Sequence, residues 1–160
     1  MAVFFLDTSA LVKPYLREVG ADTVRSILAG ARERIYISSH VALEVVATFA
    51  YKLRDRQVDG RTYRRIRRDF FADIPRSLRM AEVDKATLER AMLLADEHRA
   101  IGVGSVDLIH IATVEQLAEA SGTRPTIVCA DRAMRNLAAA AGFGVFNPET
   151  DDPATLAAGG

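Results

Sequence analysis

Short runs of β-branched and aromatic residues alternate along this chain with longer amphipathic stretches, and this alternation constrains the fold more than any other feature. Strands that alternate with helices on this spacing are typical of a parallel sheet covered by helices on both faces. The sequence therefore predicts an α/β domain with three α/β/α layers and a mostly parallel central sheet. The runs that predict strands are Ala2–Leu6, Arg34–Ile37, Leu78–Val83, Thr126–Cys129 and Gly144–Phe146.

The stretches between these runs predict helices, and their ends carry residues that start or stop helices. Ser38 or Ser39 is expected to cap the helix that continues to Arg56, and Ser105 to cap the helix that reaches Ala120. The sequence Ile74-Pro75 is expected to stop the basic helix before it, because the residue before a proline is pushed out of the α region. The other predicted helices are 10–17, 21–28, 62–72, 84–99 and 131–141.

Length and composition favour one ordinary globular domain. A chain of 160 residues buries enough surface to fold without a disulfide or a structural metal. Its single Cys129 allows neither an intramolecular disulfide nor a thiolate zinc site, which favours a reducing, cytoplasmic setting. No apolar run approaches the roughly 18 residues of a membrane span, and the first residues lack the order of a signal peptide, so we expect no membrane partner.

The charges are balanced overall but unevenly distributed. Lys and Arg together number 21, as do Asp and Glu, yet residues 51–80 hold ten basic residues against four acidic ones. Such a basic segment can contact a phosphate backbone, whereas the acidic remainder can hold cations. A solvated helix face is an equally good explanation of the basic run. The residues in question are Arg61, Arg64, Arg65, Arg67 and Arg68.

Four acidic residues lie in unusual surroundings. Asp7 directly follows the first strand run and Asp131 the fourth, where each could simply cap the next helix. Glu44 interrupts an apolar helical stretch, where an unpaired carboxylate would be costly to bury unless a cation, a hydrogen bond or a cleft compensates it. Asp107 lies in the first turn of an otherwise apolar helix, where the helix dipole favours a negative charge with or without a metal.

Together the four acids make a stronger case than each alone. Ligand sites in parallel sheets lie beyond the carboxyl ends of the strands, where carboxylates from four segments can converge. Without a cation such a cluster would repel itself, and oxygen ligands without clustered Cys or His suit Mg²⁺ or Mn²⁺ better than zinc. Such an ion can polarise a phosphoryl oxygen and activate water, which is the chemistry of phosphodiester hydrolysis.

The weaker features receive no role. His110 lies one helical turn after Asp107 and could reach the cleft, yet a hydrogen-bonded core histidine explains it equally well. No group of other candidate catalytic or ligand residues accompanies His40 or His98. Gly102-Val-Gly104 lacks the third glycine, the lysine and the preceding strand of a phosphate loop, so we interpret it as a hinge.

Five segments, in order, resemble the motifs of one protein family: Phe5–Glu18 with Asp7-Thr-Ser, Ser38–Glu44, Asp107-Leu-Ile-His-Ile-Ala-Thr, Val128-Cys-Ala-Asp131-Arg, and Gly142–Pro148. They resemble the PIN-domain family, in particular the VapC-like ribonuclease toxins of bacterial and archaeal toxin-antitoxin pairs. The resemblance spans nearly the whole chain. Two residues depart from the usual pattern, Cys129 for a frequent Thr and Val114 for a frequent Ala, and neither departure removes a candidate ligand.

The resemblance implies a single compact PIN-like nuclease domain over residues 1–148. Residues 151–160, with two acids, a proline and a small-residue ending, predict a flexible tail, which we expect to span 149–160. The resemblance also implies cleavage of RNA with Mg²⁺ or Mn²⁺ held by Asp7, Glu44, Asp107 and Asp131, supported by the hydroxyl of Ser9. It further implies a homodimer, and a cognate antitoxin that wraps along residues 39–72 and blocks the acidic pocket.

Two other functions stay open on the residues alone. A PIN scaffold can bind RNA or a protein without cutting, although the intact acids argue against this. A phosphatase with an aspartate nucleophile after its first strand usually carries a second Asp two residues later, and here that residue is Ser9.

Overall fold

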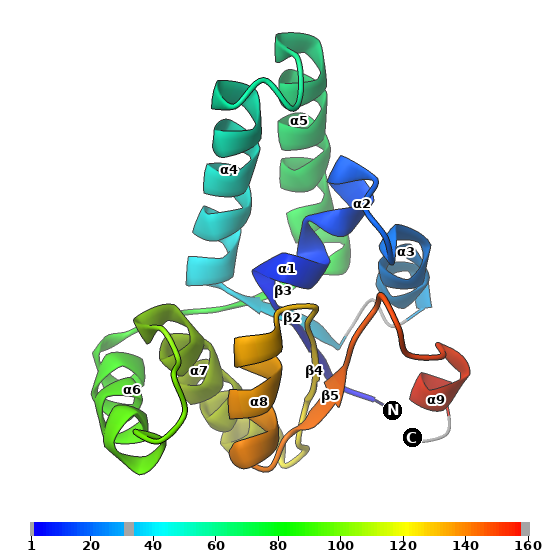
Figure 1. Cartoon of the computed structure of the whole chain (residues 1–160). Helices are drawn as coiled ribbons and strands as arrows, with labels where there is room; N and C mark the ends of the chain where they lie inside the picture. The colour runs from blue at the N-terminus through cyan, green and yellow to red at the C-terminus, as the bar shows by residue number, and fades with distance from the viewer. Residues whose placement is uncertain (1, 31–33, 158–160) are drawn as a thin grey trace.

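The computed structural model describes residues 2–30 and 34–157, which are arranged around one twisted sheet (Figure 1). The strands lie in the order β3-β2-β1-β4-β5, and every strand pairing is parallel. The predicted parallel sheet is therefore confirmed, with all five predicted strands present and most of them shorter than expected. Their bounds are β1 Phe4–Leu6, β2 Ile35–Ser38, β3 Arg79–Ala81, β4 Thr126–Val128 and β5 Gly144–Phe146.

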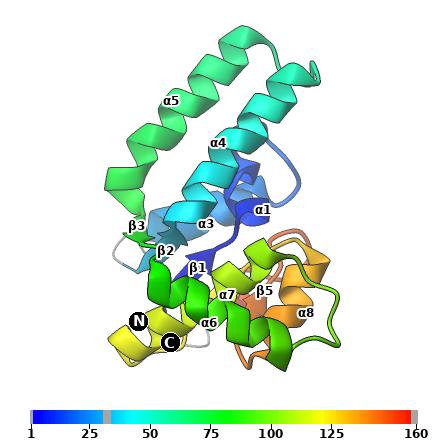
Figure 2. The same ribbon diagram turned by 90° about the vertical axis from the view of Figure 1, so that its left-hand side faces the viewer.

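Helices cover both faces of the sheet, which confirms the three layers (Figures 1 and 2). The helices before β3 pack on one another on one face of the sheet, and those between β3 and β5 pack together on the other face. The chain runs from β1 to β3 toward one edge of the sheet and from β4 to β5 toward the other, and right-handed crossovers in opposite directions place their helices on opposite faces. Their bounds are α1 Thr8–Leu11, α2 Lys13–Leu16, α3 Ala21–Gly30, α4 Ser39–Arg54, α5 Gly60–Ser77, α6 Lys85–Glu97, α7 Ser105–Ser121, α8 Arg132–Ala140 and α9 Ala154–Ala157.

The core lies on both faces of the central strand. All three residues of β1 are buried, as are Ile35 and Ile37 of β2 and Ile127 of β4. A strand with helices above and below it must be apolar on both sides, which explains why β1 is a continuous apolar run rather than an alternating one. Asp7 comes directly after this run, so its position is fixed by the most buried strand of the domain.

Helices α4 and α5 form an antiparallel hairpin that projects from the body of the domain (Figures 1 and 2). It is anchored to α2 by three aromatic rings: Tyr15 of α2 lies 5.7 Å from Phe49 and 5.6 Å from Phe70, and these two lie 6.1 Å apart, all edge to face. The Tyr15 hydroxyl also donates to Asp73 at 2.8 Å. This aromatic cluster fixes the hairpin, and with it Glu44, relative to the sheet.

The expected stop before Pro75 is wrong, because α5 continues through this proline to Ser77. Pro75 lies in the last turn of the helix, so its missing N–H removes a single helical hydrogen bond. Leu78 still donates to the carbonyl of Ile74 at 3.2 Å. Burial of Ile66 and Phe70 holds the preceding turns in place, and packing therefore outweighs the local preference at Ile74.

The expected cap of α7 is also wrong. Gly104 is the N-cap residue and Ser105 is already helical. The Asp107 carboxylate accepts a hydrogen bond from the Gly104 N–H at 3.2 Å, so a side chain inside the first turn satisfies the helix start in place of a serine hydroxyl. Of the two serines considered as the cap of α4, Ser38 is the N-cap residue, and its hydroxyl accepts from the Val41 N–H at 3.0 Å.

The described part of the expected tail, residues 149–157, contacts the domain. The Glu149 carboxylate pairs with the buried ammonium of Lys13, Asp151 accepts from the Asn147 N–H, and Leu156 packs against the core. The rest of the tail, residues 158–160, lies outside the described residues. In the described ranges, no helix has both the length and the apolar character needed to cross a bilayer.

Candidate active site

The strand order creates a crevice between β1 and β4. The chain leaves β1 toward β2 on one side, whereas it leaves β4 toward β5 on the other, so the helices that follow the two strands lie on opposite faces of the sheet. Ligand sites in open parallel sheets lie at such a switch point, beyond the carboxyl ends of the strands. Asp7 follows β1 here and Asp131 follows β4, which places two of the predicted acids at the crevice.

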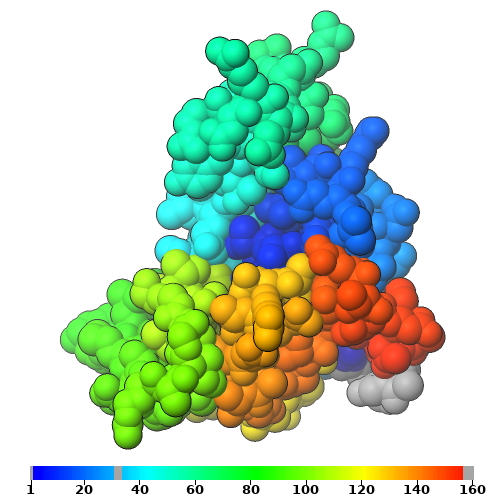
Figure 3. Space-filling model, viewed as in Figure 1, coloured from blue at the N-terminus to red at the C-terminus, as the bar shows by residue number. Residues whose placement is uncertain are grey.

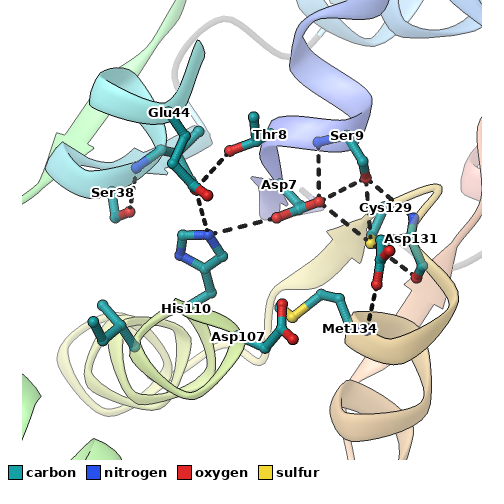
Figure 4. A network of polar contacts seen from close by, with 12 residues as sticks. Asp7, Thr8, Ser9, Ser38, Glu44, Asp107, His110, Cys129, Asp131 and Met134 are labelled. Carbon is teal, nitrogen blue, oxygen red and sulfur yellow. Dashed lines mark hydrogen bonds and ion pairs between the residues drawn. The ribbon is translucent and has the colours of Figure 1, made fainter. Parts of the chain in front are cut away.

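Asp7 is buried and tightly held by Ser9. Its Oδ2 atom accepts from the Ser9 N–H at 3.0 Å and from the Ser9 hydroxyl at 2.6 Å, so Asp7 is the N-cap of α1 (Figure 4). The same hydroxyl accepts from the N–H groups of Ala130 at 2.9 Å and Asp131 at 3.2 Å. Ser9 therefore joins the end of β1 to the loop after β4, while the supporting role expected for it in a metal site stays a prediction.

Asp131 and Asp107 both bond to the starts of their own helices. Asp131 Oδ1 accepts from the Met134 N–H at 2.8 Å, and Asp107 Oδ2 accepts from the Gly104 N–H. The capping explanation considered for Asp131 is therefore correct as a description of its contacts. It does not exclude a second role, because each carboxylate has another oxygen.

Glu44 lies in the second turn of α4, across the crevice from Asp107. Its Oε2 atom accepts from the Thr8 hydroxyl at 2.7 Å and lies 3.0 Å from His110 Nε2. Burial raises the pKa of Glu44, but the hydrogen bonds with His110 and Thr8 outweigh burial, so the pKa lies below its ordinary value. Glu44 is thus a compensated carboxylate that stays ionised.

The four acids lie at this edge of the sheet and are held by the protein in the same way (Figure 4). Within the described residues, each carboxylate uses one oxygen for its hydrogen bonds with protein groups: Asp7 Oδ2, Glu44 Oε2, Asp107 Oδ2 and Asp131 Oδ1. The hydrogen bonds hold the groups in place, and among the described residues the second oxygen of each carboxylate makes no hydrogen bond, although Asp7 Oδ1 lies 3.6 Å from His110 Nε2.

The electrostatics of the crevice favour a cation. Burial raises the pKa of Asp107, and the negative charges of Asp7 and Asp131 raise it further, against the opposing hydrogen bond from Gly104. Burial also raises the pKa of Cys129, whose thiol donates to Asp7 Oδ2 at 3.5 Å, so this sulfur stays protonated and is a poor metal ligand. Carboxylate oxygens, rather than this sulfur, are therefore the donors that the crevice offers to a cation.

This donor set fits Mg²⁺ or Mn²⁺, which prefer oxygen ligands. Over the described ranges, no three Asp, Glu, His or Cys side chains are already gathered closely enough to hold one ion. Each of these carboxylates instead bonds to nearby N–H or O–H groups of the protein. The structure thus brings the four acids to one edge but leaves their oxygens apart.

Three contacts of this site were not foreseen in the sequence. His110 is 1% exposed and bonds to Glu44, Thr8 bonds to the same carboxylate, and the Cys129 thiol touches Asp7. The position of His110, three residues after Asp107 in an apolar helix, was a usable signal, because a polar side chain there must find a buried partner. For Thr8 and Cys129 the sequence offers no comparable signal.

The basic residues of α5 lie elsewhere. Helix α5 begins at the outer end of the hairpin, so its first half lies away from the acids (Figures 1 and 3). Asp69 pairs there with Arg68 at 2.8 Å and with Arg65 at 3.9 Å, whereas Arg61 and Arg64 are exposed. The structure does not bring this basic half-helix, which carries Arg61, Arg64, Arg65, Arg67 and Arg68, into contact with the acids.

Replacing Asp107 with Asn is expected to raise the melting temperature of the metal-free protein at pH 7.5. An acid whose pKa is raised by folding stabilises the folded state at low pH and loses this contribution as the pH rises through the folded pKa. Asn removes the repulsion from Asp7 and Asp131 and keeps an oxygen that can accept from Gly104. We expect the advantage to shrink between pH 7.5 and pH 4.5, measured in EDTA by scanning fluorimetry.

The exposed Asp96 of α6 provides the matched control, and Asp96→Asn is expected to leave the melting temperature unchanged. An Asp107→Asn variant that melts below the wild type in EDTA at pH 7.5 would show that the Asp107 charge does not destabilise the metal-free fold.

One family model and several solved structures resemble this chain. The family model described as PIN domain matches residues 4–140. Among solved structures, FitAcB from Neisseria gonorrhoeae superposes with a TM-score of 0.67 at 19% identity and covers 91% of this chain and 98% of its own. The sarcin-ricin-loop-cleaving toxin VapC20 from Mycobacterium tuberculosis gives 0.62 at 18% identity, with 93% and 99% covered.

A toxin-antitoxin complex from Klebsiella pneumoniae also matches, with a TM-score of 0.59, 16% identity, and 91% of this chain and 97% of that chain covered. At these identities the structural likeness shows the fold alone. A comparison with curated proteins found no match.

Proposed function

This chain belongs to the PIN-domain family, and on that basis we propose that it is an endoribonuclease that uses Mg²⁺ or Mn²⁺ and acts as the toxin of a toxin-antitoxin pair. The observation that carries the proposal is the set of four carboxylates at the switch point of the sheet, each with one oxygen held by the protein and one left over. A PIN scaffold that only binds has no need of four such groups at one edge.

In this proposal, Asp7, Asp107 and Glu44 hold the principal ion. Asp131 completes the site, or positions a second ion or the attacking water. A divalent ion bound there supplies polarisation of the phosphoryl oxygen, activation of water and stabilisation of the leaving oxygen.

The remaining groups of the site prepare the carboxylates for this task. Ser9 fixes Asp7 against the backbone of residues 130 and 131, which sets the separation of Asp7 from Asp131. Thr8 holds Glu44 from the other side. The second helical layer contributes Asp107, whose backbone partner Gly104 lies at the start of the same helix. A phosphodiester in the crevice would therefore meet acids that the protein holds at the same edge of the sheet.

The proposed substrate is RNA. The structurally similar protein from M. tuberculosis is a toxin that cleaves the sarcin-ricin loop, and the present chain carries a basic half-helix that suits a phosphate backbone. Arg61 and Arg64 are the better candidates for phosphate contacts, because Arg65 and Arg68 already pair with Asp69.

Replacing both Arg61 and Arg64 with Ala is expected to weaken RNA binding and reduce its salt dependence. Each lost phosphate contact lowers the slope of log K against log salt by about 0.7 for a single strand. Anisotropy of a labelled single-stranded RNA, measured with an Asp7→Asn background to prevent cleavage, gives this slope. Arg99→Ala is the control, since Arg99 is also exposed but follows α6. Equal slopes in the wild type and the double variant would remove these arginines from the RNA interface.

The proposed partners are a cognate antitoxin and a second copy of this chain. Support for an antitoxin comes from the similar fold in the K. pneumoniae toxin-antitoxin complex and from exposed apolar side chains along residues 39–72: Leu43, Tyr51 and Phe71. We propose that such a partner buries these apolar side chains. A reducing, cytoplasmic setting stays a prediction from the single cysteine.

The test is digestion of total cellular RNA by the purified protein with Mg²⁺, with Mn²⁺ and with EDTA. Discrete fragments that depend on the metal would support the nuclease and reveal its cut site. If a folded, metal-loaded protein left all RNA intact yet retained RNA or an antitoxin, the alternative of a non-cleaving binding protein would replace the proposal.

A further inference from the structure

One buried side chain of the site has no role in the proposal above. His110 of α7 is 1% exposed, and its Nε2 atom lies 3.0 Å from Glu44 Oε2 and 3.6 Å from Asp7 Oδ1 (Figure 4). The other ring nitrogen, Nδ1, is buried and has no hydrogen-bond partner among the described residues. The one hydrogen bond of this histidine among the described residues is therefore with Glu44, and Asp7 is the next carboxylate beside it.

The neighbours of Nε2 determine where its proton lies. Both are carboxylate oxygens, and an ionised carboxylate only accepts hydrogen bonds. A bare Nε2 would face them with a lone pair, so the arrangement requires an Nε2–H group that donates to Glu44. A histidine that merely filled the core would more often bond to a backbone carbonyl or a solvent-facing group.

The ring has little freedom to turn away. Phe5 of β1 lies 5.9 Å from it and His40 of α4 lies 6.0 Å from it, centroid to centroid. His110 comes from the helical layer opposite α4, so its bond to Glu44 crosses the site from one layer to the other. The contact therefore couples the projecting hairpin, which carries Glu44, to the body that carries Asp7.

We propose that His110 is a positioning residue whose Nε2–H fixes the rotamer of Glu44 and its separation from Asp7, so that both carboxylates can bind one divalent ion. The inference rests on the proposed function, because it concerns the same metal site. Thr8 assists by donating to the same oxygen, Oε2, so that Oε1 of Glu44 is the atom left for the ion. Partners that orient ligands in this way typically change metal affinity about 10–100-fold when removed.

Two amide variants of His110 distinguish the loss of the Nε2–H donor from the loss of the ring. The glutamine side chain in His110→Gln can place its amide N–H near the position of Nε2, whereas the side chain in His110→Asn is one carbon shorter and cannot reach Glu44. Both variants lose the ring contacts with Phe5 and His40, so a merely structural histidine would respond alike to both changes.

The measurement is calorimetric titration of each protein with MnCl₂ alone, with melting temperatures recorded beside it. We expect His110→Asn to bind Mn²⁺ at least about tenfold more weakly than the wild type, and His110→Gln to stay within about threefold, while both melt at similar temperatures. Equal affinities in all three proteins, or an equal loss in both variants, would overturn the positioning role.

Failure of the proposed function has a different signature. Wild-type protein that binds no Mn²⁺ would remove the metal site itself, and with it this inference. A wild type that binds Mn²⁺ and cuts RNA, next to a His110→Asn variant of unchanged affinity, would leave the nuclease standing and overturn only the role of His110.

A measurement on the unaltered protein covers the case in which neither variant folds. Nitrogen–proton correlation spectra of the metal-free protein should show a proton on Nε2 of His110, with a nuclear Overhauser contact to the Glu44 side chain. A spectrum in which Nε2 carries no proton would contradict the donor that the proposal requires.

Discussion

Asp7→Asn is expected to reduce RNA cleavage by at least about a hundredfold without lowering the melting temperature. Asp7 is the buried acid at the end of the central strand, and its loss removes both a ligand and the charge that attracts the ion. A divalent ion contributes several kcal/mol of transition-state stabilisation in such sites, and each 1.36 kcal/mol is a factor of about ten in rate.

The fold should tolerate this change. Asn is as good an N-cap as Asp, so the amide oxygen can keep the hydrogen bond from the Ser9 N–H. The variant also removes one of the charges that repel Asp107, which favours the metal-free fold. Single-turnover cleavage of a defined RNA together with thermal melting in EDTA gives both quantities.

Asp22→Asn is the control for a lost negative charge, because the Asp22 carboxylate lies on the surface of α3 and its side chain is 99% exposed. This variant should cleave at the wild-type rate. Wild-type cleavage by a purified Asp7→Asn protein would contradict the assignment of the metal site, and loss of fold in that variant would contradict the account of α1 capping.

Phe70→Ala is expected to destabilise the protein by about 3–5 kcal/mol, the range for a buried phenylalanine whose site cannot collapse. Phe70 is fully buried beside Tyr15 and Phe49, where α5 packs against α2 and α4. Removing the ring opens a cavity where the hairpin meets α2. Urea denaturation followed by circular dichroism measures the free energy of unfolding.

The adjacent Phe71 provides a matched control on the same helix. It is 48% exposed, and Phe71→Ala should change the free energy of unfolding by less than about 1 kcal/mol. If the two variants were equally stable, the aromatic cluster would not be what anchors the hairpin. Because Glu44 is carried by the hairpin, we also expect Phe70→Ala to bind Mn²⁺ more weakly under conditions where it remains folded.

Much of the fold was predictable because it depends on local patterns. Runs such as Ala2–Leu6 and Gly144–Phe146 are short, apolar and bounded by turn residues, and the structure has strands there. The helix through Pro75 was not predictable, since the packing of Ile66 and Phe70 decided it, and packing partners distant in sequence are invisible to a local pattern.

The site, like the fold, was predictable only in part. The four acids could be selected because carboxylates after strands and inside apolar helices are costly without a purpose, and the structure places them at one edge of the sheet, while their roles stay a prediction. The role proposed for His110 could not be predicted, because it depends on the side-chain geometry between α7 and α4. Cys129 is similar: only the contact with Asp7 shows that it lies against the site.

The pairing of β1 with β4 also affects the order in which the molecule becomes functional during synthesis. Phe4 pairs with Thr126 and Leu6 with Val128, so the crevice joins the beginning of the chain to a segment more than one hundred residues later. Such long-range contacts form late in folding, and a growing chain cannot form this one until β4 has left the ribosome. An incomplete chain therefore has no assembled acidic site, and a protein proposed to destroy RNA would be made at the ribosome in an inactive form.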